Sequence, residues 1–576
     1  MTDLDLRTPP QGRTTSRLAA AGIGVALVIP ILLLTYWAFR PGLDNQFLNW
    51  DDDRNFLLNP AYRGLGTDEL HWAWRTYHMG VWQPLAWLLL SVQYVADGLH
   101  PKVYHQVSLA LHALNAVVFF LVTAQILRAA RGKAPPRSLV ATYFGAAVAA
   151  ILFAVHPLRA ETVTWISAQP YLPAALFFML AVSAYLQAHH AAPQDRTHWV
   201  WLVVAFVCYL LAVGSKAVAV TLPAVLLILD VYPLRRWPGT GRGLAGRTTR
   251  IIIEKIPFFV VALFVSIWAA QAKDFNETRV PLRDFKADAR LAQSAYGMAF
   301  YPLKTVVPTG LIPFYKLPHD LSLARWPYAR AALFVGNITL GLFLIRRRWP
   351  AAIAAWLAYA VILLPNVGLL QISQQIAADR YSYLATMPLM VLLAGGVSAL
   401  WSTKTTTIRA GTIALSAAAA IALAIGSNRQ VRIWHDSKTL WATTLRIDPR
   451  CAVAECELGT AFIETQEYKK AIAHCETAIK LEPDFAFAYT NLGAIHLHQG
   501  ELSAALRMYQ KALDGPGLRQ MDLAKTHAGI GAVCAGLGEY DLAWKHTRRA
   551  EQLGFPTEKT QPMINALRKV SREPEN

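Results

Sequence analysis

Apolar and polar positions of this chain alternate in long blocks rather than residue by residue. Apolar runs of about 17 to 25 residues recur, which is the length that an α-helix needs to cross a bilayer. Short polar segments rich in Arg, Pro and Gly separate the runs. We therefore predict about eleven membrane-spanning helices. They lie near 18–39, 103–127, 138–155, 170–188, 199–214, 217–234, 251–270, 329–345, 350–367, 382–401 and 409–427.

The composition supports this prediction, since 54% of the 576 residues are hydrophobic and only 16% are charged. The first run is too long for a signal-peptide core, and Tyr36-Trp37-Ala38-Phe39 is a poor cleavage site, so we expect it to stay as an anchor. We expect the segment Leu291 to Pro308 to be interfacial or re-entrant. Counted as a crossing, it would place the Arg346 triplet on the opposite side from the other basic loops.

The basic loops set the predicted orientation. Arg128 and Arg131, Arg235 and Arg236, and the triplet Arg346-Arg347-Arg348 all fall on one side of the predicted spans, which is then cytoplasmic. The formal net charge of +18 is largely accounted for by such loops. No basic motif interleaved with aromatic residues is present, so membrane lipid rather than nucleic acid is the expected partner. We predict a protein of the bacterial inner membrane with its N-terminus in the cytoplasm.

A repeat begins at about residue 452. Leu458-Gly459, Ala471 and Pro483 have the spacing of a tetratricopeptide (TPR) hairpin, and Leu492-Gly493 with Ala505 repeats it 34 residues later. A third copy around Ile530-Gly531 is degenerate. The predicted fold is all-α: a polytopic helical bundle followed by an α-solenoid of about three hairpins. The predicted divisions are a tail at 1–17, a membrane domain at 18–430 with a first external loop at 40–102, a linker at 431–451, TPR hairpins at 452–555 and a tail at 556–576.

Three consecutive carboxylates, Asp51-Asp52-Asp53, follow the first span by about ten residues. Such a cluster at a membrane boundary could supply a catalytic base, a metal ligand or an ion-entry ring, or it could be a solvated turn before a helix. Other polar groups are predicted on the same side of the membrane, except His112 and Asn115, which lie one turn apart within the second span. They are His112 with Asn115, His156, Arg159, Glu161, Lys216, Arg380, Tyr381 and Tyr383.

The run Trp50 to Pro60, with the segments 104–116, 152–165, 216–233 and 378–384, resembles the membrane O-mannosyltransferase-like proteins that carry C-terminal TPR units. The resemblance covers about two thirds of the chain in the family's order, and the architecture looks like the GT-C class of glycosyltransferases. One segment departs from the pattern. Ser167-Ala168-Gln169-Pro170-Tyr171 stands where the family usually shows a charged pair ending in Asp.

The resemblance implies a single-displacement, inverting transfer of a mannose-like sugar from a polyprenyl-phosphate carrier to Ser or Thr hydroxyls of exported proteins. Asp51 would be the base, with Asp52 as second choice. The site would lie outside the cytoplasm, and the TPR hairpins would engage the acceptor or a partner protein. Arg380, Lys216 and Arg159 would stabilise the leaving phosphate, Tyr381 or Tyr383 would border the sugar, and Asp53, His156, Glu161 and His112 would support the pocket.

Carboxylates and phosphate also suit Mg²⁺ or Mn²⁺, but no sequence pattern demands a metal, and we assign no metal ligands. Two other interpretations stay open. One is a non-enzymatic membrane scaffold that displays TPR hairpins, which the altered segment 167–171 favours. The other is a transporter or flippase, which predicts discontinuous helices with charges near the middle of the membrane.

Overall fold

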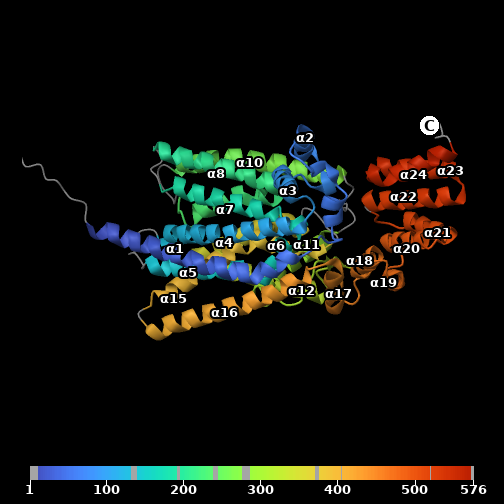
Figure 1. The fold of residues 1–576 in the computed structure, drawn as a ribbon. Coiled ribbons are helices and arrows are strands. Elements are labelled where there is room, and N and C mark those ends of the chain that lie inside the picture. Colours follow the sequence, from blue (N-terminus) through green and yellow to red (C-terminus); the bar gives the residue numbers. More distant parts are fainter. Residues whose placement is uncertain are drawn as a thin grey trace, which may run out of the picture.

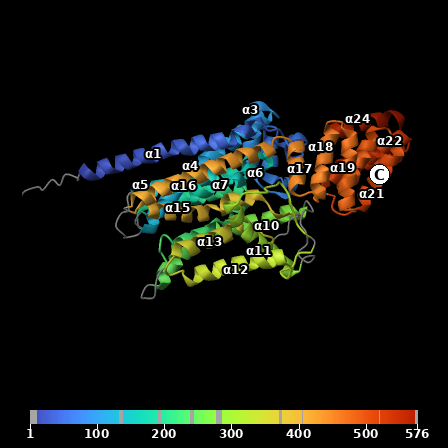
Figure 2. The same ribbon diagram turned by 90° about the horizontal axis from the view of Figure 1, so that it is seen from below.

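The computed structural model describes residues 11–131, 139–190, 195–237, 244–275, 286–318, 320–369, 375–403, 405–518 and 520–571. Residues 1–10 of the predicted N-terminal tail and 572–576 of the predicted C-terminal tail lie outside the described residues. Long helices run side by side in the N-terminal three quarters of the chain, and a stack of shorter helices continues from one end of this bundle (Figures 1 and 2).

The bundle is built almost entirely of helices. The described residues contain two short strands, β1 (Tyr315–Lys316) and β2 (Gln375–Ala377), which pair antiparallel. The long helices are α1 (Gln11–Phe39), α4 (Pro101–Arg131), α5 (Leu139–Ala154), α7 (Tyr171–Ala188), α8 (Arg196–Ser215), α9 (Leu222–Val231), α10 (Leu244–Phe275), α11 (Ala287–Val306), α12 (Trp326–Leu344), α13 (Pro350–Leu363), α15 (Met387–Trp401) and α16 (Thr406–Ile433).

Each predicted span coincides with a helical segment. By length and composition, the described residues hold 7 helices able to cross a membrane, or up to 9 if each of two bent pairs is one span. The predicted spans at 217–234 and 350–367 correspond to the shorter apolar helices Ala217–Val231 and Pro350–Asn366. The prediction of about eleven spans is therefore met only if these two short segments also cross. Helix α11, on the segment expected to be interfacial or re-entrant, is not among the candidates.

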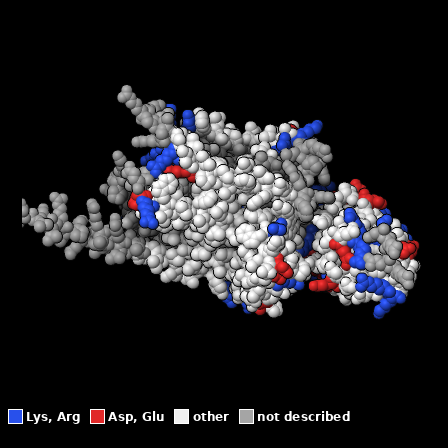
Figure 3. Space-filling view, turned by 90° about the horizontal axis from the view of Figure 1, so that it is seen from above, with Lys and Arg blue, Asp and Glu red and all other residues white. Residues whose placement is uncertain are grey.

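The outer surface of the bundle is apolar, as a lipid-facing surface must be. Only 11% of the most apolar window of α12 is buried inside the protein, and 17% of that of α16. In Figure 3 charged side chains gather at the two ends of the molecule, and the body between them is mostly uncharged. The chain is thus an integral membrane protein.

The first external loop is folded into short helices and turns. Helices α2 (Thr67–Arg75) and α3 (Pro84–Asp97) follow a one-turn π-helix at Asp53–Leu57, and 3-10 turns lie at Arg40–Asp44, Pro60–Tyr62 and His78–Gly80. Aromatic side chains form the core of this loop. Trp87, Tyr62 and Tyr104 are almost completely buried, and the Tyr62 and Tyr104 hydroxyls lie 3.2 Å apart.

The predicted TPR hairpins are confirmed. They are formed by α18 (Ala452–Glu464) with α19 (Tyr468–Leu481), α20 (Ala486–His498) with α21 (Leu502–Asp514), and α22 (Gln520–Leu537) with α23 (Tyr540–Gln552). Helix α24 (Thr557–Val570) covers the last hairpin, and α17 (Ser437–Ile447), inside the predicted linker, joins α16 to the first. A Cβ on Gly493 would lie 2.8 Å from the Tyr509 ring, so only glycine permits this close approach of α20 and α21.

Helices α5 and α15 approach each other closely at Gly145. A Cβ on Gly145 would collide with the carbonyl oxygen of Ala394 and would lie 3.0 Å from the backbone nitrogen of Ser398. Both obstacles are main-chain atoms of α15, which cannot rotate away. Small residues let helices pack tightly in a membrane, where lipid offers no hydrophobic drive for association.

We predict that Gly145→Ala lowers stability by about 1 to 3 kcal/mol, because the added methyl group must push α5 away from α15. The measurement is the thermal unfolding midpoint of the purified protein. Gly396→Ala is the matched control, because no atom lies within 4 Å of the methyl group it adds to α15. Equal midpoints for the two variants would contradict the close packing of α5 and α15.

Candidate functional site

Two broken helices meet at the end of the bundle that carries the TPR stack. Helix α5 bends by 58° into the segment Pro157–Thr164, and the segment Asp379–Ala385 bends by 53° into α15. Pro157 begins the first break, and its lack of an N–H makes it suited to a first helical turn. Because α5 has 16 residues and α15 has 15, each break lies about 23 Å from the basic end of its helix. That depth is near the far edge of a bilayer core about 30 Å thick, not at its middle.

The two breaks are joined by buried polar contacts. The Glu161 carboxylate accepts hydrogen bonds from the Arg380 backbone N–H, at 2.7 Å, and from the Arg380 guanidinium. In the opposite direction, Arg159 donates to the Ser382 hydroxyl at 2.9 Å and to the Thr386 hydroxyl at 2.7 Å. Arg159 and Glu161 are buried, whereas 13% of the Arg380 side chain is exposed. Among these three charged groups, Arg380 is the one that reaches open space.

The acidic triplet places its three carboxylates in different surroundings. Asp51 is half-buried and has a left-handed backbone, with φ of 65°. This conformation is uncommon outside glycine, although Asp and Asn tolerate it better than other residues. Asp53 lies 3.5 Å from the ammonium of Lys525 in the TPR stack. Of these two carboxylates, that of Asp53 therefore lies close to a cation of the TPR stack.

Asp52 is completely buried, and both of its oxygens are occupied. One accepts the backbone N–H and the hydroxyl of Ser167 at 3.0 and 2.5 Å, and the other accepts the Leu48 N–H at 3.1 Å. Burial raises the pKa of the Asp52 carboxyl to about 8, against the opposite effect of these three hydrogen bonds. Asp52 thus fixes the loop to the segment after the first break and is enclosed away from any ligand.

A row of aromatic rings links the acidic triplet to the cations. The Trp165 indole N–H donates to the Trp50 carbonyl at 2.7 Å, directly before Asp51. The Arg380 guanidinium lies 5.3 Å from the centre of the Trp165 ring and 4.9 Å from that of Tyr381. Cations stack on such rings through the ring quadrupole. The predicted base and the predicted phosphate cation are therefore neighbours of the same tryptophan.

Lys216 reaches this cluster from α8. Its ammonium lies 5.3 Å from the centre of the Tyr171 ring and donates to the Gln83 side chain at 2.8 Å. Tyr171 is in turn close enough to Arg380 to interact with it. The structure therefore brings the predicted residues Lys216 and Arg380 to the same tyrosine.

Two predicted residues lie deeper than the cluster. Tyr383 is fully buried, and its hydroxyl accepts from Asn115 at 3.1 Å. His112 Nε2 donates to the Ala154 carbonyl at 2.9 Å, which leaves Nδ1 to accept from the Tyr383 hydroxyl at 2.7 Å. His112 and Tyr383 thus brace the helices beneath the breaks.

His156 has a similar supporting position. Its Nδ1 accepts the Leu158 N–H at 3.2 Å, and its Nε2 donates to the Thr305 carbonyl of α11 at 2.9 Å. This side chain therefore fixes the first break to α11 rather than facing a ligand.

The segment 167–171, where the family pattern is altered, forms a neutral polar network. Besides the Ser167–Asp52 contact, the Gln169 amide donates to Gln93 at 3.1 Å and to Ser108 at 2.9 Å. Of the side chains in this network, only that of Asp52 can carry a charge, and it accepts hydrogen bonds from Ser167 and Leu48. The network replaces the expected charged pair with contacts that connect the loop to α3 and α4.

The TPR stack is docked onto the acidic loop. Arg54 and Asp522 form an ion pair of 2.6 Å in which the two side chains are 5% and 4% exposed. Asn49 adds a second contact by donating to the Glu457 carbonyl at 2.8 Å and accepting from the Trp441 indole at 2.8 Å. We call these contacts the TPR–loop junction. They place α22 and α18 directly beside the acidic triplet.

The sequence did not predict the partners that build this site: Ser167 for Asp52, Asp522 for Arg54 and Trp165 for Arg380. Each pair joins residues far apart in the chain, and no local pattern marks them. A second cluster was also missed. At the basic end of the bundle Lys255 pairs with Asp230 at 2.7 Å, and Arg236 pairs with Glu254 at 2.7 Å. The signal that could have revealed it is the Glu254-Lys255 dipeptide inside a predicted apolar span.

Within the described ranges, no three His, Cys, Asp or Glu side chains are arranged to hold a metal ion.

Comparisons with known proteins support the family suggested by the sequence. The TPR repeat family matches residues 459–500. The chain is 20% identical over 463 residues to the human protein O-mannosyl-transferase TMTC3, covering 75% of this chain and 48% of that protein. It is 21% identical over 533 residues to the mouse protein of the same name, covering 85% and 54%. The resemblance to TPR-bearing membrane O-mannosyltransferases is confirmed.

The chain spans about half the length of the curated relatives it matches best in coverage. A shorter match to the Drosophila melanogaster protein O-mannosyl-transferase Tmtc3 reaches 30% identity over 161 residues, with 26% of this chain and 17% of that protein. Among solved structures, the apo oligosaccharyltransferase of Archaeoglobus fulgidus aligns with 71% of this chain and 56% of its own at 15% identity. Its TM-score of 0.37 is too low to relate the two folds.

We predict that Asp522→Asn destabilises the TPR–loop junction by about 3 to 5 kcal/mol, because it removes the carboxylate that is ion-paired with the buried Arg54 guanidinium. Hydrogen exchange of α22 and of residues 48–58 should increase together. Glu482→Gln is the matched control. It breaks the Lys316–Glu482 pair, whose side chains are about one third exposed (33% and 29%), and such pairs contribute about 0 to 1 kcal/mol. Unchanged exchange in Asp522→Asn would show that the stack is held elsewhere.

The buried Asp52 carboxyl predicts a pH dependence of stability. Folding raises the pKa of Asp52 from 3.8 to about 8, so the folded state binds the proton more tightly. The stabilisation that comes from this tighter proton binding by Asp52 is fully present below about pH 4 and is lost as the pH rises through about 8. Between about pH 5 and about pH 9, the unfolding midpoint of the native chain should therefore fall relative to that of Asp52→Asn. A constant difference between the two proteins over this range would contradict the shifted pKa.

Proposed function

We propose that this protein is a membrane glycosyltransferase that moves a mannose-like sugar from a polyprenyl-phosphate carrier to Ser or Thr hydroxyls of exported proteins. One observation carries the proposal. The Trp165 indole, whose ring lies against the cation Arg380, also donates a hydrogen bond to the Trp50 carbonyl directly before Asp51, which has a strained backbone conformation. Strained residues concentrate at functional sites because surrounding contacts must hold them in place. The similarity to protein O-mannosyltransferases supplies the reaction class.

In the proposed reaction Asp51 and Arg380 have different roles. A hydroxyl attacks a sugar carbon efficiently only if a carboxylate removes its proton, and Asp51, which is half-buried and matches the first acidic residue of the family pattern, can receive it. The leaving group is a lipid phosphate, whose growing negative charge needs a fixed cation. Arg380 fits this task, because Glu161 holds one edge of its guanidinium while part of the side chain stays exposed.

The remaining predicted residues take supporting parts in this proposal. Lys216 lies beside Tyr171 and gives a second cation at the edge of the cluster. Arg159 is fully buried and holds the turn that presents Arg380 through Ser382, so it positions the phosphate cation rather than binding phosphate itself. Tyr381, which lies against Arg380, is better placed to border a sugar than the enclosed Tyr383.

The TPR stack fits the role of presenting the acceptor. Its helix α22 contributes Asp522 and Lys525 to the acidic loop, so a peptide bound along the stack would reach the triplet without crossing the membrane. TPR arrays commonly bind peptides or proteins on their concave face. With the site on the extracytoplasmic side of a bacterial inner membrane, both the lipid-linked sugar and an exported chain can reach it.

The main alternative is a non-enzymatic scaffold that uses the bundle to display the TPR stack. The neutral network at Ser167 and Gln169 favours it, since it replaces charges expected from the family pattern. The two bent helix pairs are discontinuous, as the transporter alternative predicts. However, their breaks and charges lie toward one edge of the membrane. That position suits a reaction at the surface better than passage through the middle.

We predict that Asp51→Asn lowers the rate constant of sugar transfer by about 100-fold to 10,000-fold, because the amide cannot take the acceptor proton. Asparagine has the size of aspartate and tolerates the left-handed backbone, so the loop should keep its structure. The measurement uses the purified full chain, a polyprenyl-phosphate mannose and a panel of exported proteins, with transferred sugar counted on Ser and Thr.

Asp97→Asn is the matched control for this experiment, because Asp97 lies in the same external loop and is half-exposed at 50%. It should transfer sugar at the native rate. A native chain that transfers no sugar from any such donor would favour the scaffold. Native activity in Asp51→Asn would remove Asp51 from the mechanism.

A further inference from the structure

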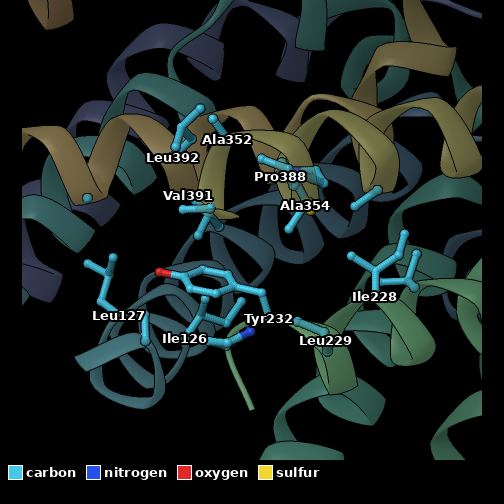
Figure 4. A pocket seen from close by; sticks show the side chains of 18 of the residues that line it. Ile126, Leu127, Ile228, Leu229, Tyr232, Ala352, Ala354, Pro388, Val391 and Leu392 are labelled. Atoms are coloured by element: carbon cyan, nitrogen blue, oxygen red, sulfur yellow. The ribbon is translucent and has the colours of Figure 1, made fainter. Parts of the chain in front are cut away.

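A large cavity lies away from the candidate site, among the membrane helices. It has a volume of about 690 Å³ and is enclosed by α4, α7, α9, α13 and α15. In Figure 4, apolar side chains such as Ile126, Leu229 and Val391 surround an open space next to the Tyr232 ring. Ligand pockets commonly have volumes of about 300 to 1,000 Å³, so the cavity can hold a flexible hydrocarbon chain.

Among the described residues that line this cavity, every charged side chain is an arginine. These arginines are Arg131 at the end of α4, Arg235 after α9, and Arg348 before α13. Arg235 and Arg348 are exposed, and no Asp or Glu of the described residues lines the cavity. An apolar interior with a cationic mouth is complementary to a molecule that has a hydrocarbon chain and an anionic head.

The mouth lies at the opposite end of the helices from the candidate site. Helix α7 runs from Tyr171, beside Lys216, to Ala188; α9 and α15 likewise begin near the candidate site and end away from it. Met387 and Leu384, just below the second break, line the inner part of the cavity. The three arginines therefore face the membrane surface that is predicted to be cytoplasmic.

The turn that carries Tyr232 and Arg235 is held by a buried ion network. Asp230 accepts the Arg236 guanidinium at 2.8 Å and the Lys255 ammonium at 2.7 Å. Arg235 itself has a left-handed backbone, with φ of 52°, a conformation that costs energy in a residue other than glycine. Because the carboxylate of Asp230 is already neutralised by its own two cations, the charge of Arg235 stays available at the mouth.

We propose that this cavity binds one acyl chain of an anionic glycerophospholipid, with the lipid phosphate against Arg235 and Arg348. Arginine presents a planar donor fork that matches phosphate oxygens. A polyprenyl-phosphate donor is a poorer occupant, because its phosphate belongs beside Arg380 at the other end of the helices. This exclusion rests on the proposed function, whereas phospholipid binding in the cavity would hold for a scaffold as well.

The test measures lipid retained by the purified full chain in detergent, by native mass spectrometry, during titration with dioleoylphosphatidylglycerol or dioleoylphosphatidylcholine. Phosphatidylglycerol should bind with the higher affinity. The double variant Arg235→Gln/Arg348→Gln should bind it roughly 30-fold more weakly, since each arginine near a membrane phosphate contributes about one kcal/mol. The double variant Arg346→Gln/Arg347→Gln removes the same charge from the same surface but does not line the cavity, and it should bind as the native chain does.

A second variant keeps the test valid if the arginine variant is unstable. Ala355→Phe places a ring inside the cavity, at a lining position on α13, and should displace the acyl chain without changing the charge. Equal binding of the two phospholipids, equal loss in both arginine double variants, or unchanged binding in Ala355→Phe would each overturn the proposal. So would selective retention of undecaprenyl phosphate in place of phosphatidylglycerol.

Discussion

Polar groups removed from water must find partners inside the protein. This constraint determines the structure of the end of the bundle that carries the TPR stack. Each broken helix leaves backbone groups and a charged side chain at a depth where water is scarce. Glu161 on one break binds both the backbone and the side chain of Arg380 on the other, and Arg159 returns two hydrogen bonds to Ser382 and Thr386. The two breaks can exist only as a pair. That pairing also determines where the one partly exposed guanidinium points.

In the external loop, contacts between aromatic rings rather than between charges join segments that are far apart in the chain. Trp50 lies in a group of indoles that includes Trp165 and Trp441, with ring centres 6.4 and 5.1 Å away from its own. Trp165 belongs to the segment after the first break, and Trp441 belongs to α17. A single residue therefore touches the membrane bundle and the start of the TPR stack. The acidic triplet that follows it is positioned by both parts of the chain.

The sequence was most informative where the pattern is repetitive. Apolar run length predicted the positions of the apolar helices that coincide with the eleven spans, and the spacing of Gly459, Ala471 and Gly493 predicted the hairpins, because both signals reflect local geometry. The resemblance also pointed to residues that lie together, such as Glu161 and Arg380. The structure shows which charged residues of a motif are buried, and the sequence alone does not show this. Burial separates Asp52 from Asp51 and Arg159 from Arg380, and burial depends on partners more than a hundred residues away, such as Ser167 for Asp52.

The order of biosynthesis adds a consequence to the TPR–loop junction. Arg54 is made 468 residues before its partner Asp522, which corresponds to roughly 25 to 95 seconds at ordinary rates of translation. During that interval the membrane helices can insert, while the loop has a charge without its final counter-ion. The acidic triplet reaches its mature surroundings only when the last-made hairpins arrive. A nascent chain stalled within the final repeats would therefore be inserted in the membrane and still lack an assembled site.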